Sequence, residues 1–97
     1  MTQHTDITLT FEEILAASRC RRDWLLELIE EEIISVNGRP EQTLYSGFQL
    51  ARIRRAQRLS RDFDAGIPAL GLIMRLLYEV EELRKAQQPL SLLDEGK

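Results

Sequence analysis

Hydrophobic residues recur every three or four positions in four stretches of the chain, and this spacing predicts four helices. The first two stretches are short, at residues 11–18 and 21–31, and the tight turn between them is typical of a helix–turn–helix unit. The third stretch begins after Ser46, and the fourth, which is the longest, covers residues 67–87. The pattern therefore predicts a mostly α fold.

Polar residues and glycine mark the expected ends of these helices. Thr10–Glu13 and Ser46–Gln49 both have the capping-box pattern, in which two side chains satisfy the first free amides of a helix. Gly66 is expected to end the third helix in a left-handed conformation, and Pro68 suits the first turn of the fourth. The third helix is expected to turn five apolar side chains inward: Phe48, Ile53, Ala56, Leu59 and Phe63.

Residues between the second and third helices predict a small β-hairpin, or wing. Ile33–Val36 would form its first strand and Thr43–Tyr45 the return strand, with the turn signal Asn37-Gly38 between them. A short strand, Ile7–Leu9, is expected before the first helix. The predicted architecture is a winged helix-turn-helix with a small β-hairpin wing and a long C-terminal helix.

The long fourth helix carries two apolar stripes. One steps by four and three residues, as in the seam of a coiled coil, and the other, Leu70, Met74 and Leu77, follows only the first half. A helix with two stripes needs two partners, so we expect a homodimer in addition to packing on the chain's own core. The alternative is one wide face on a single core. The expected dimerisation residues are Ile73, Leu76, Val80 and Leu83.

The length of 97 residues allows one domain with a small core. We expect this domain to cover residues 1–88, with a dimerisation helix at 67–88. Pro89 should block further helix, and residues 89–97 have no periodicity, so a flexible tail is expected.

Composition argues against catalysis and against a membrane span. The chain is 43% hydrophobic and 30% charged, too apolar for a disordered chain and too charged for a membrane one. Cys20 and His4 are the one cysteine and the one histidine, which cannot form a zinc site or a plausible Cys–His nucleophile pair. We therefore expect no enzyme activity, cofactor or metal. A lone thiol and a polar N-terminus without a leader pattern favour the cytoplasm.

The net charge of −3 conceals blocks of a single sign. Five arginines without an intervening acid lie on the third helix: Arg52, Arg54, Arg55, Arg58 and Arg61. The end of the second helix carries only acids: Glu27, Glu30, Glu31 and Glu32. Such blocks create local potentials that steer charged partners. The alternative is that they are ordinary solvated helix faces.

The order of elements resembles the MerR-like winged-helix group across roughly residues 7–85. The resemblance rests on three motifs: Leu44–Ser46, Leu50–Leu59 and Phe63–Leu70. Within that group the chain is most similar to CbpM-like chaperone-modulator proteins, through its small size and the segments Phe11–Glu13 and Ile73–Leu83.

This resemblance implies a binding protein. CbpM-like proteins bind the J-domain of CbpA, a DnaJ-like co-chaperone, and block its stimulation of the Hsp70 ATPase, and the family is dimeric through the long helix. The alternative is a MerR-family DNA-binding transcriptional regulator, whose second helix would lie in the major groove.

Charge on the second helix favours the J-domain. DNA binding needs basic residues near phosphates, but this helix has only Arg21 and Arg22, at its start. MerR regulators usually have an Arg-Tyr-type pair where this chain has Leu25-Leu26-Glu27. The family resemblance implies a basic J-domain helix, which acids would attract, so we expect DNA binding to be no better than non-specific. The candidate partner-binding residues are Leu26 as an exposed apolar anchor, with Glu27, Glu30, Glu31, Asp62 and Asp64.

Overall fold

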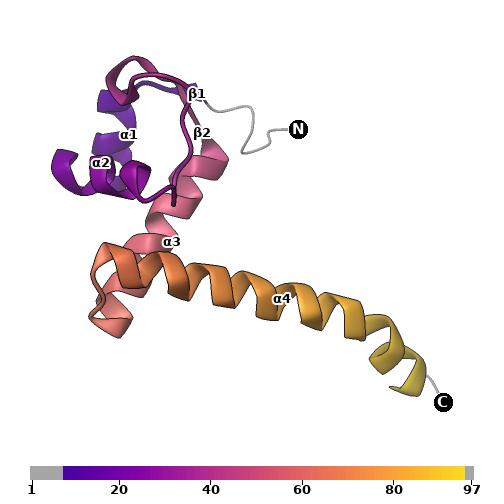
Figure 1. Ribbon diagram of the computed structural model, residues 1–97. Coiled ribbons are helices and arrows are strands. Elements are labelled where there is room, and N and C mark those ends of the chain that lie inside the picture. The colour runs from indigo at the N-terminus through magenta and orange to yellow at the C-terminus, as the bar shows by residue number, and fades with distance from the viewer. Residues whose placement is uncertain (1–7, 96–97) are drawn as a thin grey trace.

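The structure is a computed structural model that describes the backbone of residues 8–95 and the side chains of residues 8–87 (Figure 1). In chain order the elements are β1 (Thr8–Leu9), α1 (Phe11–Ser18), α2 (Arg22–Glu30), the 3₁₀ turn η2 (Pro40–Gln42), β2 (Tyr45–Ser46), α3 (Gly47–Phe63) and α4 (Ile67–Glu95). The predicted fold class is confirmed: helices dominate, with a two-stranded antiparallel sheet and a long C-terminal helix. Ile7 and the last two residues of the expected tail lie outside the described residues.

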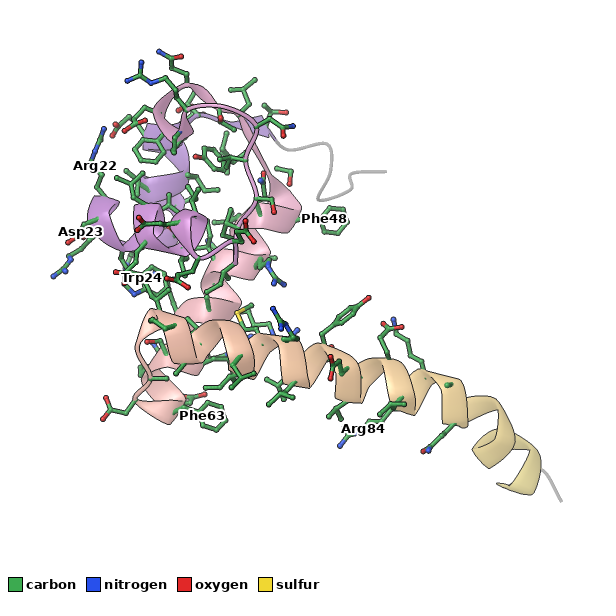
Figure 2. All side chains as sticks on the ribbon, in the orientation of Figure 1. Arg22, Asp23, Trp24, Phe48, Phe63 and Arg84 are labelled. Atoms are coloured by element: carbon green, nitrogen blue, oxygen red, sulfur yellow. The ribbon has the colours of Figure 1, made fainter. Side chains whose placement is uncertain are left out.

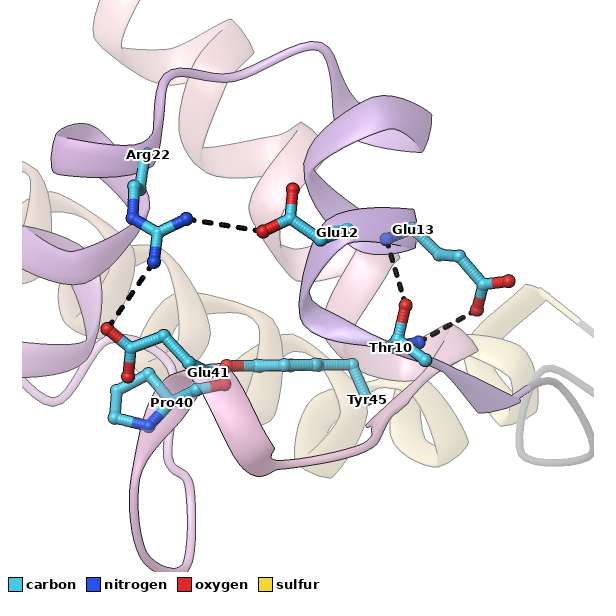
Figure 3. Close-up of polar contacts among 7 residues, drawn as sticks. All are labelled: Thr10, Glu12, Glu13, Arg22, Pro40, Glu41 and Tyr45. Carbon is cyan, nitrogen blue, oxygen red and sulfur yellow. Dashed lines mark hydrogen bonds and ion pairs between the residues drawn. The ribbon is translucent and has the colours of Figure 1, made fainter.

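Both predicted capping boxes are present. The Glu13 amide donates to Thr10 Oγ1 at 3.1 Å, and the Thr10 amide donates to Glu13 Oε1 at 2.9 Å (Figure 3). Ser46 and Gln49 make the same reciprocal pair at the start of α3, at 3.2 and 2.7 Å. These bonds satisfy amides that a helix start leaves without an intrahelical partner, so the sequence fixes where α1 and α3 begin.

The predicted pairing of the wing strands is wrong. Tyr45–Ser46 pairs with Thr8–Leu9, in an antiparallel register that sets Thr8 opposite Ser46 and Leu9 opposite Tyr45. Ile33–Val36 forms no strand, and the wing between α2 and β2 contains the turn η2 instead. The Tyr45 hydroxyl donates to the Pro40 carbonyl at 2.8 Å and holds this turn against the sheet.

The core explains why Ile33–Val36 does not pair as a strand. The amides of Ile33 and Ile34 both donate to the Leu28 carbonyl, at 2.9 and 3.3 Å, so they complete the end of α2. Both isoleucine side chains are buried, at 5% and 1% exposure. The β-branched residues Ile33 and Ile34 therefore provide the hydrophobic contact that follows the C-terminal end of α2.

Each of α1, α2 and α3 is followed by a non-glycine residue with positive φ. These residues are Arg19 at 59°, Glu32 at 62° and Asp64 at 51°. Gly66, which the sequence predicts as the left-handed end of α3, does not have positive φ, so that prediction is wrong. Asp64 takes the role because aspartate tolerates this conformation better than most residues do, and the Ala65 amide closes the turn on the Ser60 carbonyl at 3.0 Å.

Side chains from all four helices form the core. Its members include Phe11 and Ile14 of α1, Leu25 and Leu28 of α2, Ile53 and Ala56 of α3, and Ile67, Leu70 and Met74 of α4. Phe48 and Phe63 were expected there but are 60% and 58% exposed, and both project from α3 (Figure 2). Phe48 lies five residues before Ile53, about 140° around the helix, and Phe63 is the last residue of α3.

The helix α4 packs on the core at its start and then projects away from it (Figure 1). Pro68 lies in its first turn, as predicted. The expected stop at Pro89 is wrong, since the backbone remains helical to Glu95. A proline inside a helix removes one hydrogen bond and bends the axis, and Figure 1 shows the axis turning near its yellow end. We call residues 8–74 the head and residues 75–95 the arm.

Candidate functional site

The two arginines at the start of α2 are engaged with carboxylates. Arg22 reaches Glu12 at 3.2 Å and Glu41 at 3.7 Å (Figure 3), and its guanidinium lies 4.9 Å from the centre of the Phe11 ring. Arg21 pairs with Asp23 at 3.3 Å. Arg22 thereby links α1, α2 and the wing, a contact that sequence spacing does not reveal. The start of α2 carries little free positive charge.

The acids at the other end of α2 are free of such partners. Glu27, Glu30 and Glu31 are exposed, and within the described part of the chain their carboxylates make no ion pair or hydrogen bond. Glu27 and Glu30 lie on the helix, and Glu31 is its C-terminal cap. This end of α2 therefore presents carboxylates that no cation of the described residues contacts within 4.0 Å.

Leu26 and the aspartates of the α3–α4 corner do not extend this surface as expected. Leu26 is half-buried and packs against the core, so the expectation of an exposed anchor is wrong. Other parts of the chain pack on more than one side of α2. Leu26 therefore contacts the core although it lies outside the main apolar stripe of the helix. Asp62 and Asp64 are exposed, at the end of α3 and in the turn that follows it.

Sequence reasoning missed two arginines that lie beside the acids. Glu31 and Glu32 line a groove of about 420 Å³ together with Arg52 of α3 and Arg75 of α4, and we call it the charged groove. Its remaining walls include Ile33, Gly71 and Leu72. Periodicity predicts that Arg52 points outward, and the residue is exposed, while its Nε also donates to the Ile33 carbonyl at 2.6 Å.

Other polar side chains of α3 also bind backbone carbonyls of the head. Arg54 donates to Ala17 O at 3.2 Å, and the Gln57 amide donates to Ser18 O at 2.9 Å. Both carbonyls lie at the C-terminal end of α1, where the helix dipole favours donors and positive charge. Part of the arginine block is thus used for internal packing.

The two stripes of α4 have different environments. Leu70 and Met74 are buried in the core at 0% and 4% exposure. The predicted seam is open: Ile73 is half-buried, and Leu76, Val80 and Leu83 are 51%, 41% and 64% exposed. An uncovered row of large apolar side chains is typical of a surface that meets another protein.

Metal-ligand clusters and titratable groups with a shifted pKa are the features that would mark a reactive site. They contain no group of three or more His, Cys, Asp or Glu that could hold a metal ion. Burial raises the pKa of the Tyr45 hydroxyl, and the negative charge of Glu41 adds to the effect. His4 lies outside the described residues. Within the described part, the helices are too short or too polar to cross a bilayer.

The helix-turn-helix fold of the chain agrees with a comparison of its sequence against known protein families. The model of the MerR HTH family regulatory proteins matches residues 9–91, which is most of the chain. The chain belongs to this family.

One protein of known name is similar to this chain in sequence. The chaperone modulatory protein CbpM of Pseudomonas entomophila (strain L48) is 30% identical over 63 residues, which cover 64% of this chain and 62% of the relative. The chain is therefore similar to a chaperone modulator, and the match spans less than two thirds of that protein's length.

Proposed function

We propose that this chain is a modulator, specifically an inhibitor, of a DnaJ-like co-chaperone of the CbpA type. It binds the J-domain and thereby blocks stimulation of the Hsp70 ATPase. The action is steric, because a covered J-domain cannot reach Hsp70. It requires no cofactor and no catalytic step, and it takes place in the cytoplasm.

The observation that carries the proposal is the charge arrangement on α2. Glu27, Glu30 and Glu31 have exposed carboxylates without partners, whereas Arg21 and Arg22 are engaged with acids. A basic partner surface meets complementary potential at this end of α2, which speeds association and makes it sensitive to salt. Similarity to a chaperone modulatory protein supports the same partner class.

The exposed seam of α4 supports a homodimer as the active form. Leu76, Val80 and Leu83 are 51%, 41% and 64% exposed, and their spacing matches a coiled-coil seam. A second copy of the same helix presents an identical stripe and buries both. Each dimer then carries two acidic α2 ends.

The test combines Glu27→Lys, Glu30→Lys and Glu31→Lys and titrates the J-domain of a DnaJ-like protein from the same genome. We expect binding to weaken at least about tenfold at ~0.15 M salt, where exposed charges still interact over roughly 8 Å. The Glu→Gln triple variant is the matched control for shape, and its loss should be smaller because it removes charge without reversing it. Unchanged affinity in a variant with an unchanged melting curve would move the site away from α2.

A DNA-binding regulator remains the alternative function, since the family match includes the helix-turn-helix. We expect only non-specific binding, because both arginines at the start of α2 already face carboxylates. Selection from fragmented genomic DNA tests this. Enrichment of one operator, with affinity lost in Arg21→Ala or Arg22→Ala, would favour the regulator.

A further inference from the structure

A second pocket, of about 290 Å³, lies between the start of α2 and the second half of α3. It shares no lining residue with the charged groove. Its lining includes the one cysteine and the one tryptophan of the chain, and we call it the indole pocket. The lining residues are Cys20, Arg21 and Trp24 from the α1–α2 turn and α2, and Gln57, Ser60 and Arg61 from α3.

Internal hydrogen bonds hold the two sides of the indole pocket in place. The Gln57 amide donates to the Ser18 carbonyl at 2.9 Å, which ties α3 to the end of α1 just before Cys20. The Ser18 hydroxyl also donates to Cys20 Sγ at 3.2 Å. Ser60 Oγ donates to the Ala65 carbonyl at 2.7 Å and closes the end of α3. The pocket is therefore formed by segments that are bonded to one another.

Trp24 gives the pocket a flat apolar wall. It is half-buried and packs against the core, as Cys20 does. Figure 2 shows Trp24 projecting from α2 toward the region where α3 leads into α4. The core supports one part of the indole and leaves another part accessible. A planar ring can pack on such a surface by offset stacking, which adds to ordinary apolar burial.

Arg61 gives the same pocket a positive charge. Its side chain is exposed and makes no ion pair within the described residues. Arg21, the other guanidinium of the lining, already pairs with Asp23 at 3.3 Å. Asp62 follows Arg61 along the chain but does not line the pocket. Arg61 is therefore the cation that a ligand in the pocket would meet.

We propose that the indole pocket binds a small aromatic carboxylate. The aromatic ring stacks on Trp24, and the carboxylate accepts hydrogen bonds from the guanidinium of Arg61, whose planar fork matches a carboxylate in shape and charge. A volume of about 290 Å³ is at the low end for small-molecule pockets and suits one ring with a short acidic chain. The pocket contains none of the candidate J-domain residues, so this ligand is independent of the proposed function.

The combination of an aromatic wall and a cation distinguishes this ligand from simpler ones. An inorganic anion such as phosphate would meet Arg61 but leave the indole of Trp24 uncovered. A neutral aromatic ring would cover the indole but leave the guanidinium without a partner. An aromatic carboxylate is complementary to both.

The wild-type chain carries its own reporters for the test, because Trp24 and Cys20 are unique in the sequence and both line the pocket. The probe is 3-phenylpropionate. We expect it to change the fluorescence of Trp24 saturably, with a dissociation constant on the order of 1 mM or lower, which is ordinary for a ligand of this size. At saturation it should slow alkylation of Cys20 by iodoacetamide at least about threefold, because thiol reactivity depends on access.

Two matched ligands separate the contributions of charge and ring. The uncharged 3-phenylpropionamide has the same shape and should bind about fivefold more weakly, the size of effect that an exposed ion pair gives. The saturated acid 3-cyclohexylpropionate keeps the carboxylate but cannot stack, and it should also bind more weakly than the aromatic acid.

One substitution assigns the charge to Arg61. Arg61→Gln should weaken binding of 3-phenylpropionate about fivefold and abolish the preference for the acid over the amide. The matched control is Arg58→Gln, an exposed position three residues earlier on α3 that does not line the pocket. It changes the net charge by the same amount and should keep the wild-type affinity. Both side chains are exposed, so both variants should melt like the wild type.

Several results would overturn the proposal. They are the absence of a saturable fluorescence change, equal affinity for the acid and its amide, equal affinity for the aromatic and the saturated acid, and binding that leaves Cys20 unprotected. Equal losses in Arg61→Gln and Arg58→Gln would also overturn it, because general charge attraction would then hold the ligand. None of these measurements uses a J-domain, so their failure would leave the proposed function standing.

Discussion

The head and the arm share one helix and one hydrophobic period, but their apolar side chains have opposite environments. In the head, Leu70 and Met74 of α4 are 0% and 4% exposed, whereas Leu76 and Leu83 of the arm are 51% and 64% exposed. Helical spacing predicts that apolar residues share a face. Spacing alone, however, does not determine which surface covers that face. In the head, the rest of the chain covers it.

Truncation of one leucine on each side should give the largest contrast. Leu70→Ala removes a fully buried side chain from the core and should cost about 2–5 kcal/mol of unfolding free energy, because it leaves a cavity. Leu83→Ala should cost far less at concentrations where the chain is monomeric. Urea melts of both variants measure the difference. Equal losses would mean that the arm folds back on the head.

Charges placed on the seam should break self-association without unfolding the head. Leu76→Glu with Val80→Glu removes apolar burial worth roughly 2–3 kcal/mol in a dimer. Light scattering should give about twice 11.3 kDa for the wild type and 11.3 kDa for the variant. Leu76→Ala with Val80→Ala should be intermediate. A monomeric wild type at micromolar concentration, or a double variant that unfolds, would contradict the assignment of the seam.

Tyr45 gives a pH test that is confined to the head. Its pKa is raised in the folded state, while the unfolded chain ionises near ~10. The unfolded state therefore loses its proton first, so stability is full below pH ~10 and falls as the pH rises above it. Tyr45→Phe should lower stability by about 1 kcal/mol at neutral pH, because the bond to Pro40 is lost. The variant should also lose part of the alkaline decline, which thermal melts at several pH values would show.

The ion pair between the head and the arm should have the smallest effect. Arg55 reaches Glu81 at 2.9 Å, but the side chains are 36% and 49% exposed. Exposed pairs contribute about 0–1 kcal/mol and weaken with salt. A double-mutant cycle with Arg55→Ala and Glu81→Ala should give a coupling near 0.5 kcal/mol or less. A coupling well above 1 kcal/mol would show that the arm is anchored more firmly than its exposure suggests.

The sequence predicted the local features of the fold well. Residue type and spacing predict the capping boxes at Thr10 and Ser46, because each involves residues only three positions apart. The sequence also predicts the two apolar stripes of α4, because both lie on one helix. The sequence does not predict the pairing of Thr8–Leu9 with Tyr45–Ser46, because a contact between segments far apart in the chain depends on how the helices pack.

The candidate site was less predictable for a related reason. The acidic end of α2 follows from the sequence, because Glu27, Glu30 and Glu31 are close along the chain. The positions of Arg52 and Arg75 beside them do not, since those residues come from two other helices. The sequence does not show that Leu26 is half-buried, because helix α2 packs on more than one side.

The left-handed residues that follow three helices leave this protein with an unused reserve of thermostability. Glycine at such a position typically relieves roughly 0.5–1 kcal/mol of backbone strain. Arg19 and Asp64 make no ion pair within the described residues, so protein engineers could replace both by glycine, and the change at Asp64 would also remove one candidate partner-binding carboxylate. Together the two changes would raise the melting temperature by several degrees in a domain of this size. A chain that carried both glycines would tolerate more destabilising substitutions elsewhere, which is the raw material from which a new binding specificity evolves.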